Sequence, residues 1–322
     1  MNISALMMGR GSIGFRNLQG LGKIPAVSLI YLQEDTKERS ERLRELCRAD
    51  PHLSQKQLIF LQNIEDLSQI PDLVLSTVTA AQQISIHKEI FDKFQVAPRI
   101  VILETPIASG RQALAEILQL IPNAYVNSTR SLWPGYIRLK RELAELTMAG
   151  QRLKFEFIGN MRGIGSNGVN YIQLFRMLSG ARELRVKKAN LTPTEHRRQG
   201  DYVEFEGELI IEADERHEFH LVCTDVAGGI AIFEPPSIFV KDFNEKILFR
   251  IDEPAGRIHP HEGERYELGQ LFVSDSIQIA VDGILEHGES RLPGIKDSTI
   301  DHLALFDALD LALGEKTDFG IG

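Results

Sequence analysis

Short apolar runs alternate with helix-like segments over the first third of the chain. Four of these runs are typical of buried strands, and they lie at residues 3–8, 27–32, 73–77 and 100–103. Helical segments lie between them, including residues 13–22 and the highly charged stretch 36–48. Strands that alternate with helices form right-handed βαβ units, in which helices cover both faces of a parallel sheet. We therefore expect an α/β domain with a parallel sheet over residues 1–123.

The hydropathy pattern changes after about residue 123. Helices are expected at 134–148 and 168–179, with a strand at 153–158 between them. Pro134 favours the first helix, because proline is tolerated in a first turn. Strands are then expected to dominate, at residues 202–213, 217–223, 229–233, 237–241, 246–251 and 270–281, before a closing helix at 298–314. The alternation in YVEFEGELIIEA favours antiparallel pairing, so residues 124–322 are predicted to form an α+β domain with a large, mostly antiparallel open sheet.

The composition fits two domains of ordinary globular character. The chain has 322 residues, 43% of them hydrophobic, and single cores rarely grow much beyond about 250 residues. The formal net charge of −9 argues against nucleic acid as a partner. Two cysteines, Cys47 and Cys223, are too few for a disulfide framework and fit a reducing compartment. We find no signal peptide and no apolar run of about 20 residues, so a cytoplasmic protein without membrane contact is expected.

A glycine-rich motif follows the first predicted strand. The sequence GRGSIG fits the pattern G-x-G-x-x-G and lies between that strand and the first helix. In such a turn the glycines allow a tight bend, close approach of a pyrophosphate to the backbone, and close packing of helix on strand. The motif therefore predicts a Rossmann-type dinucleotide site. Its cofactor-binding positions are Gly9, Arg10, Gly11, Ser12, Ile13 and Gly14.

The end of the second predicted strand is expected to contact the adenosine ribose, normally through an acid about 20 residues after the motif. Gln33 and Glu34 are the candidates, with Asp35 beside them. A carboxylate there slightly favours NAD over NADP, although Arg10 could bind a phosphate. In the alternative interpretation, the two acids cap the helix that starts at Thr36.

Further motifs continue the pattern through residue 180. They are the strand end LVLSTVT, with Val78 before its last threonine; Glu104-Thr105-Pro106; Asn127 and Arg130 ahead of Pro134; and Ser166-Asn167-Gly168-Val169-Asn170 ahead of a helix that ends in Leu178-Ser179-Gly180. Later, Leu292-Pro293 precedes the helical sequence HLALFDAL. In order and spacing, these motifs resemble the glucose–fructose oxidoreductase/inositol dehydrogenase (Gfo/Idh/MocA) family. The likeness covers nearly the whole chain and is most specific over residues 3–180.

The resemblance implies both a fold and a chemistry. It implies a Rossmann domain followed by a domain whose open sheet serves homodimer or higher homo-oligomer formation, with the substrate between the domains beside the nicotinamide. It also implies an NAD(P)-dependent oxidoreductase whose small-molecule substrate is a sugar, a cyclitol or a sugar derivative. Thr77 and Glu104 match further cofactor-binding positions. The implied substrate-binding residues are Asn127, Arg130, Tyr136, Ser166 and Asn167.

The usual proton-handling residues of the family are replaced in this chain. Thr105 stands where the Glu-Lys-Pro signature has lysine, and Asn170 stands where the second motif has histidine. Ser166 replaces an accompanying aspartate, and Gln82 replaces a histidine after the third strand. A hydroxyl or an amide can hydrogen-bond a substrate, but neither is a general base near pH 7. Thr105 and Asn170 are therefore catalytic candidates without ordinary acid–base chemistry.

Two tyrosines are the remaining candidates for proton transfer. Tyr171 is the third catalytic candidate, and Tyr136 lies in the predicted helix 134–148. A tyrosine can act as an acid if a nearby cation, such as Arg130 or Arg162, lowers its pKa. The alternative, which the frequent burial of tyrosine favours, is that both are packing residues.

Several other polar residues have simpler interpretations. Ser166 or Asn167 could be the N-cap of the following helix, and His87 is expected to be solvated on a helix. His217 and His220 are separated by an odd number in a predicted strand, so they should point to opposite faces. The sequence HPHEGER fits a solvated loop, and no metal site is predicted because a metal needs three or four convergent ligands.

Two hypotheses follow from the sequence. The first is an NAD(P)-dependent oxidoreductase that acts on a sugar or polyol by an atypical proton path. The second is a catalytically silent homologue that binds a dinucleotide or a sugar as a sensor, scaffold or subunit. The intact glycines favour retained cofactor binding under both hypotheses, and fold alone does not decide between them.

Overall fold

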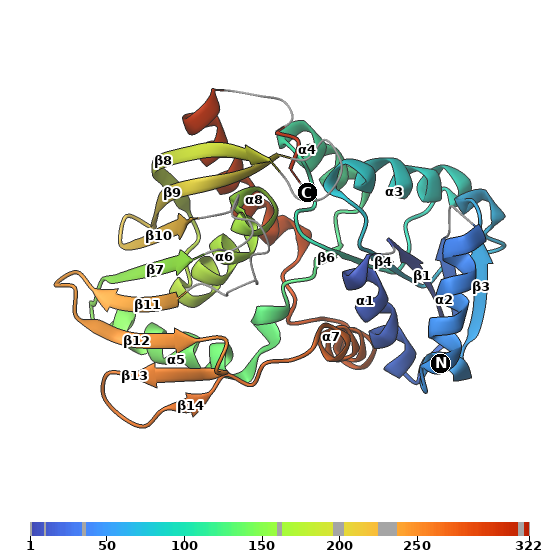
Figure 1. Cartoon of the computed structure of the whole chain (residues 1–322), viewed down its shortest axis with the longest axis horizontal. Helices are drawn as coiled ribbons and strands as arrows, with labels where there is room; N and C mark the ends of the chain where they lie inside the picture. Colours follow the sequence, from blue (N-terminus) through green and yellow to red (C-terminus); the bar gives the residue numbers. More distant parts are fainter. Residues whose placement is uncertain are drawn as a thin grey trace. The chain divides into compact units, whose positions relative to one another are not determined.

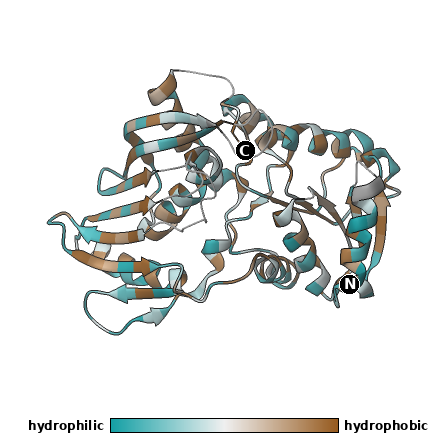
Figure 2. Ribbon diagram, viewed as in Figure 1, coloured by the Kyte–Doolittle hydropathy of each residue, from teal (hydrophilic) through white to brown (hydrophobic). Residues whose placement is uncertain are grey.

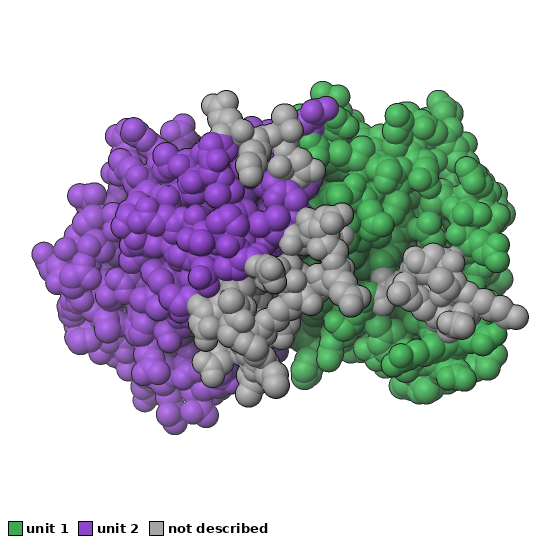
Figure 3. Space-filling model, turned by 45° about the horizontal axis from the view of Figure 1, so that its top comes forward, with its two compact units in different colours: residues 1–107, 113–129, 271–296 green, residues 108–112, 130–270, 297–322 purple. Residues whose placement is uncertain are grey.

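In a computed structural model, the chain is described for residues 2–9, 11–33, 37–159, 163–195, 203–224, 237–314 and 319–321. It divides into two compact units (Figure 3). Unit 1 comprises residues 1–107, 113–129 and 271–296, and unit 2 comprises residues 108–112, 130–270 and 297–322. Each unit contains its own sheet.

The sheet of unit 1 is parallel throughout, as predicted. Its strand order is β3-β2-β1-β4-β5-β6. The strands are β1 (Ile3–Met8), β2 (Val27–Gln33), β3 (Gln57–Leu61), β4 (Leu73–Ser76), β5 (Ile100–Leu103) and β6 (Tyr125–Val126). Every residue of β1, β4 and β5 is buried, because helices cover both faces. The strand order reverses between β1 and β4, where open α/β sheets bind ligands at the carboxyl ends of their strands.

The helices of unit 1 follow the predicted alternation, with one exception. They are α1 (Ser12–Lys23), α2 (Lys37–Ala49), α3 (Ala80–Phe94), α4 (Arg111–Leu120), whose first two residues are counted with unit 2, and α7 (Val273–His287). The predicted strand at 270–281 is wrong, because α7 occupies this segment. Its buried residues Ile277, Ala280, Val281 and Ile284 have helical spacing.

Helix α7 packs directly on α1 (Figure 1). A Cβ atom on Gly20 of α1 would lie only 2.7 Å from the carbonyl oxygen of Ser274. Lys23, at the end of α1, donates from Nζ to Asp275 at 2.5 Å. The last segment of unit 1 therefore completes the packing around its first helix, although some 250 residues separate the two in sequence.

Unit 2 contains the large, mostly antiparallel sheet that was predicted. Its strand order is β14-β13-β12-β11-β7-β10-β9-β8, and only β7 and β10 pair in parallel. The strands are β7 (Leu153–Gly159), β8 (Leu184–Glu195), β9 (Val203–Ala213), β10 (His217–Cys223), β11 (Ser237–Asp242), β12 (Ile247–Asp252), β13 (Arg257–Pro260) and β14 (Tyr266–Glu267). The strand predicted at 229–233 lies outside the described residues.

The helices of unit 2 are α5 (Pro134–Met148), α6 (Ile164–Ser179) and α8 (Ile295–Leu313), whose first two residues are counted with unit 1. Apolar and polar residues alternate along the strands of its sheet (Figure 2), so one face is available for packing. On that face, Phe175 of α6 stacks on Phe219 of β10 at 4.9 Å between ring centroids. Phe157 of β7 meets Phe219 edge-on at 5.1 Å. The core of unit 2 therefore lies between α6 and the sheet. No helix within the described ranges is long and apolar enough to cross a membrane.

Candidate functional site

The glycine motif forms a tight turn between β1 and α1. Gly9 has a φ of +91°, and a Cβ atom at this position would lie 2.5 Å from the backbone of Thr77. A Cβ atom on Gly14 would lie 2.3 Å from the carbonyl oxygen of Gly9. Thr77 donates from its backbone N and from Oγ1 to the carbonyl oxygen of Met8, at 2.8 and 2.9 Å. Only glycine fits at positions 9 and 14, because the turn packs against the end of β4.

Gly11 has the opposite surroundings. No heavy atom of the described residues lies within 4 Å of the place that its Cβ would take, apart from its chain neighbours. Gly11 is the N-cap of α1, and Ser12 and Ile13 beside it are exposed, with 41% of Ile13 accessible. The first N–H groups of a helix lack carbonyl partners within the helix and carry its positive dipole end. The turn therefore has the open, donor-rich form that fits a pyrophosphate.

Other predicted cofactor residues are only partly placed. Gln33 is the last residue of β2 and is partly exposed. Arg10 and Glu34 lie outside the described residues, as do Asp35 and Thr36. The choice between NAD and NADP and the helix-cap alternative at residues 34–36 therefore stay predictions.

Glu104 lies at the centre of a polar cluster in unit 1. Asn17 of α1 donates from Nδ2 to Glu104 Oε1 at 2.9 Å, and Asn127 donates to the same oxygen. Both asparagines are buried, at 0% and 4% exposure. Burial raises the pKa of Glu104, and this effect outweighs the amide donors that lower it. Thr105, the next residue, is partly exposed.

This cluster changes the interpretation of two residues. Asn127 was expected to bind substrate, but its amide nitrogen is used by Glu104. Asn17, which lies one helical turn after Gly14, was not predicted from the sequence. A polar residue between the apolar positions of an amphipathic helix is the signal that could have found it.

In unit 2, Arg130 forms a bidentate pair with Glu253, a residue that was not predicted from the sequence. Arg130 Nε donates to Oε1 at 2.7 Å, and Nη2 donates to Oε2 at 2.9 Å. The hydroxyl of Tyr136 also donates to Oε1, at 2.6 Å. Burial would raise the pKa of Glu253, but the charge and donors of Arg130 outweigh it and lower the pKa. Glu253 follows β12 and has no local sequence signal, because its partners are more than 110 positions away.

The two tyrosines are core residues. Tyr136 is 0% exposed and Tyr171 is 2% exposed, so the packing interpretation is confirmed. Burial raises the pKa of Tyr171 to about 12, although the guanidinium of Arg130 lies 4.9 Å from its ring. Burial and the carboxylate of Glu253 raise the pKa of Tyr136. Arg130 does lower the pKa of both tyrosines, as expected, but burial outweighs it, so neither pKa falls below its ordinary value. Arg162 lies outside the described residues.

The polar residues of α6 form one partly exposed group. The helix starts at Ile164 rather than 168, so Ser166 and Asn167 belong to its first turn. The N-cap is Gly163, and the N-cap alternative for Ser166 and Asn167 is wrong. Asn167 donates from Nδ2 to Ser166 Oγ at 2.8 Å. Residue 170 lies one turn after 166, so Asn170 and Ser166 share a face that can hydrogen-bond hydroxyl groups.

The carboxylate of Glu204, on strand β9, accepts hydrogen bonds at the start of α6. The backbone N–H of Ser166 donates to both oxygens of Glu204, each at 3.1 Å. Glu204 is 2% exposed, and burial raises its pKa more than these hydrogen bonds lower it. Glu204 was not predicted from the sequence, because its neighbour Phe205 is also buried and breaks the period-two pattern.

The histidines are placed as follows. His217 is buried and accepts a hydrogen bond from the backbone N of Leu153 at 3.1 Å, while His220 lies 2.8 Å from Glu208. Their side chains alternate along β10, so the predicted opposite faces are confirmed. His87 was expected to be solvated, but it is 2% exposed. That expectation is wrong because His87 faces inward on α3 together with Gln83 and Ile90.

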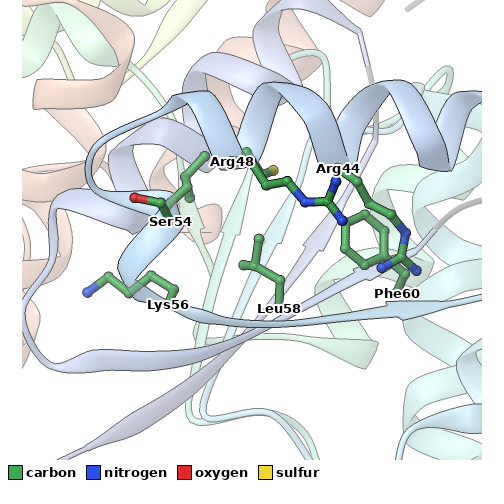
Figure 4. A pocket seen from close by; sticks show the side chains of 8 residues that line it. Arg44, Arg48, Ser54, Lys56, Leu58 and Phe60 are labelled. Carbon is green, nitrogen blue, oxygen red and sulfur yellow. The ribbon is translucent and has the colours of Figure 1, made fainter.

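A separate pocket lies between α2 and β3 (Figure 4) and has a volume of about 200 Å³. Its lining is basic and apolar and consists of Arg44, Cys47, Arg48, Leu53, Ser54, Lys56, Leu58 and Phe60. The guanidinium of Arg44 stacks on Phe60 at 3.7 Å, and Lys56 donates to the carbonyl oxygens of Ile24 and Val27. Two of its cations are thus engaged by unit 1 itself, and no candidate site residue lines the pocket.

Comparisons with known proteins match the fold rather than the sequence. No protein-family model matches the chain, and neither does a curated protein sequence. A solved myo-inositol dehydrogenase from Corynebacterium glutamicum is 13% identical, with a TM-score of 0.64 and 97% of each chain covered. An oxidoreductase from Thermotoga maritima is also 13% identical, with a TM-score of 0.70, and the match covers 99% of this chain and 97% of that one.

A third similar structure carries ligands. It is an oxidoreductase from Agrobacterium radiobacter in complex with NAD+, L-tartaric acid and magnesium. It is 12% identical, with a TM-score of 0.68, and 99% of both chains is covered. At these identities the likeness concerns the fold, and the family resemblance inferred from the motifs is confirmed at that level. The chain therefore has the fold of these oxidoreductases: a Rossmann domain combined with an α+β domain that carries a large open sheet.

Proposed function

We propose that this chain is an NAD(P)-dependent oxidoreductase that acts on a sugar, a cyclitol or a sugar derivative through atypical polar residues. The glycine turn is the observation that carries the proposal. Gly9 and Gly14 pack against their neighbours, while Gly11 leaves room for a ligand at the start of α1. The same fold occurs in a myo-inositol dehydrogenase and in an oxidoreductase solved with NAD+. When bound, the nicotinamide ring exchanges a hydride with the substrate.

Different polar residues bind the cofactor and the substrate in this proposal. In unit 1, the glycine turn, Gln33, Thr77 and Glu104 hold the dinucleotide, with NAD slightly favoured over NADP by the acids at 34–35. In unit 2, Ser166, Asn167 and Asn170 supply hydroxyl and amide groups to substrate hydroxyls, as does Thr105 in unit 1. Arg130 and Tyr136 support this arrangement indirectly, because Glu253 engages both of them.

Calorimetric titration tests the cofactor part of the proposal. The pure protein is titrated with NAD+, NADH, NADP+ and NADPH, and the saturated protein is then assayed against a panel of sugars and cyclitols. Binding followed by turnover supports the proposal. If no dinucleotide binds, the assignment of the glycine turn is wrong.

The variant Gly11→Val tests the turn itself. The backbone at Gly11 has φ −67° and ψ 179°, which valine adopts without strain, so the variant should fold. Its side chain would occupy the open space and crowd a pyrophosphate, so dinucleotide binding should fall below detection. Ala115→Val, on the exposed side of α4, adds similar bulk elsewhere in unit 1 and should bind normally. Unchanged affinity in Gly11→Val would contradict the cofactor assignment.

A silent homologue that binds a dinucleotide or a sugar as a sensor, scaffold or subunit is the second candidate function. It is favoured by Thr105 and Asn170, which cannot act as general bases, and by the raised pKa of Tyr171. The double variant Thr105→Lys, Asn170→His would supply the missing groups. Turnover in this variant but not in the natural chain supports the silent homologue, whereas turnover in the natural chain excludes it.

We also propose that the outer face of the sheet in unit 2 mediates a homodimer or a higher homo-oligomer. This face carries cross-strand ion pairs, including Lys241–Glu156 at 2.6 Å and Lys187–Glu212 at 3.0 Å. Light scattering during size-exclusion chromatography tests the proposal, and a monomer at micromolar concentration would contradict it.

A further inference from the structure

Glu204 takes the place of a capping side chain at the start of α6. The N-cap residue, Gly163, has no side chain and a φ of +107°, and a Cβ atom on it would overlap Oε2 of Glu204. The carboxylate reaches the helix from β9 instead, and it accepts hydrogen bonds from the backbone N of Ser166 and of Gly165. The first N–H groups of a helix have no carbonyl partner within it, so an acid from another element satisfies them here.

The packing around Glu204 holds its carboxylate against α6. The backbone N of Val203, one residue earlier on β9, donates to the carbonyl oxygen of Gly320 at 2.9 Å. Ile321 is 1% exposed and lies against the first turn of α6, where a Cβ atom on Gly165 would be 3.0 Å from its Cγ2. Glu204 itself is 2% exposed. The acid and the helix start therefore form one fixed unit.

The hydroxyl of Ser166 belongs to the same hydrogen-bond network. It bonds to the carboxylate of Glu204, and Asn167 donates from Nδ2 to Ser166 Oγ at 2.8 Å. Both carboxylate oxygens accept from the backbone N of Ser166, at 3.1 Å each, so the carboxylate is the acceptor and the hydroxyl is the donor. A serine hydroxyl has one hydrogen and two lone pairs. These two contacts use its hydrogen and one lone pair, which leaves one lone pair.

The remaining lone pair determines which ligand group Ser166 can bind. Ser166 is partly exposed, and it shares a face of α6 with Asn170. We propose that Glu204 fixes Ser166 as a hydrogen-bond acceptor, so that this position of the substrate site takes a hydroxyl group that donates. An oxygen that only accepts, as in a carbonyl, an ether or a phosphate, would meet the lone pair without a hydrogen between them. Glu204 is a positioning residue, because it acts through Ser166.

This inference rests on the proposed function and narrows its substrate class to compounds with a free hydroxyl at this position. Analogues of a bound sugar or cyclitol test it. The probe is the panel compound that binds most tightly to the protein saturated with reduced dinucleotide, so that no hydroxyl is oxidised during the measurement. Calorimetry compares it with analogues in which each hydroxyl in turn is replaced by hydrogen or by fluorine, which accepts but does not donate.

We expect one hydroxyl at which both replacements weaken binding about fivefold or more, because both remove the donor. In Ser166→Ala the parent compound should bind about fivefold more weakly, and the two replacements at that hydroxyl should have no further effect. If no hydroxyl loses its effect in Ser166→Ala, or if the fluorine analogue binds the natural chain as well as the parent does, the proposal is overturned.

The variant Glu204→Gln tests the positioning role. Its amide can donate to Ser166 Oγ, which frees the serine hydroxyl to donate to a ligand. We expect the parent and the fluorine analogue to bind this variant within about twofold of each other. A purely structural role for Glu204 would weaken both and keep their natural ratio, and that result overturns the proposal. Glu145→Gln, at an exposed position of α5, should keep the natural ratio.

Circular dichroism during heating shows whether the variants fold. If Glu204→Gln does not fold, the analogues and Ser166→Ala decide, since alanine at position 166 keeps the backbone N–H that Glu204 binds. If no sugar or cyclitol binds the natural chain, the proposed function itself fails. Binding that is insensitive to Ser166 overturns this inference alone, so the two failures are distinguishable.

Discussion

His87 is a buried histidine without a hydrogen-bond partner in the described part of the chain. Neither Nδ1 nor Nε2 is bonded, and burial lowers its pKa to about 4. The unfolded chain protonates this side chain below about pH 6.5, whereas the folded chain does so only near pH 4. The stability that neutral His87 permits is therefore present above pH 6.5 and is lost as the pH falls towards 4.

Replacing His87 with leucine should stabilise unit 1. Removing two unsatisfied nitrogens should raise the free energy of unfolding by about 1–3 kcal/mol at pH 7. The advantage should grow by about 2 kcal/mol at pH 5, because only the natural unfolded chain then gains a proton. Urea unfolding at both pH values measures this. The exposed His287→Leu should change little, and a His87→Leu gain that stays constant with pH would contradict the assigned pKa.

Single residues were predictable where a short motif constrains them. The glycine turn follows from six consecutive residues, because each glycine has a local steric role. His87 was also within reach, since its spacing from Gln83 and Ile90 is that of an inward helical stripe. Glu253 was not, because its role depends on Arg130 and Tyr136, which the chain brings to it from far away.

At the scale of elements, the Arg130–Glu253 pair holds the segment before α5 to the end of β12. The carboxylate of Glu253 is 2% exposed and the side chain of Arg130 is 19% exposed. A pair this deeply buried is costly to break, because the remaining charge keeps no partner.

Glu253→Gln should therefore destabilise unit 2 by about 3 kcal/mol. The pKa of Glu253 is lowered on folding, so its contribution is present above its ordinary pKa of 4.5 and is lost as the pH falls below it. The difference between natural chain and variant should shrink accordingly in acid. Denaturant unfolding measures both effects.

The exposed pair Lys246–Glu262 provides the control for this measurement. Its side chains are 48% and 87% exposed, so Glu262→Gln should cost less than about 0.5 kcal/mol. Similar losses in the two variants would show that burial does not decide the strength of the Arg130–Glu253 pair.

Element types were predicted well where the pattern is clear, as in the continuous apolar run of β1, the helical spacing of α5 and the alternation of β10. The segment of α7 was misassigned because Ile277, Ile279 and Val281 alternate with other residues and are β-branched, which favours a strand. Packing against α1 favours the helix, because a helix buries one stripe of apolar residues. That stripe consists of Ile277, Ala280, Val281 and Ile284. Local pattern alone does not contain that information.

At the scale of the whole molecule, the order of the two sheets was predictable, because each is made from a run of similar supersecondary units. The return of residues 271–296 to unit 1 was not predictable from these local patterns. This segment places α7 on α1 and pairs residues 293–295 with the chain around β6, where the backbone N of Val126 donates to the carbonyl oxygen of Pro293 at 2.9 Å.

A fragment of residues 1–129 should therefore not fold cooperatively, because the face of α1 around Gly20 would lose Ser274 and Ile277. Joining residues 271–296 to it through a flexible glycine–serine linker should restore a cooperative thermal transition. Circular dichroism during heating compares the two fragments. Cooperative unfolding of the shorter fragment would show that α7 is dispensable.

The position of α7 late in the sequence also delays the completion of unit 1 during protein synthesis. A ribosome that has finished β6 must still make residues 130–270 before α7 emerges, which takes on the order of ten seconds at about 5–20 residues per second. During that interval the face of α1 around Gly20 lacks Ser274 and Ile277, the residues that it contacts in the finished unit. We therefore expect the first unit to reach its stable fold only after most of the second unit has been translated.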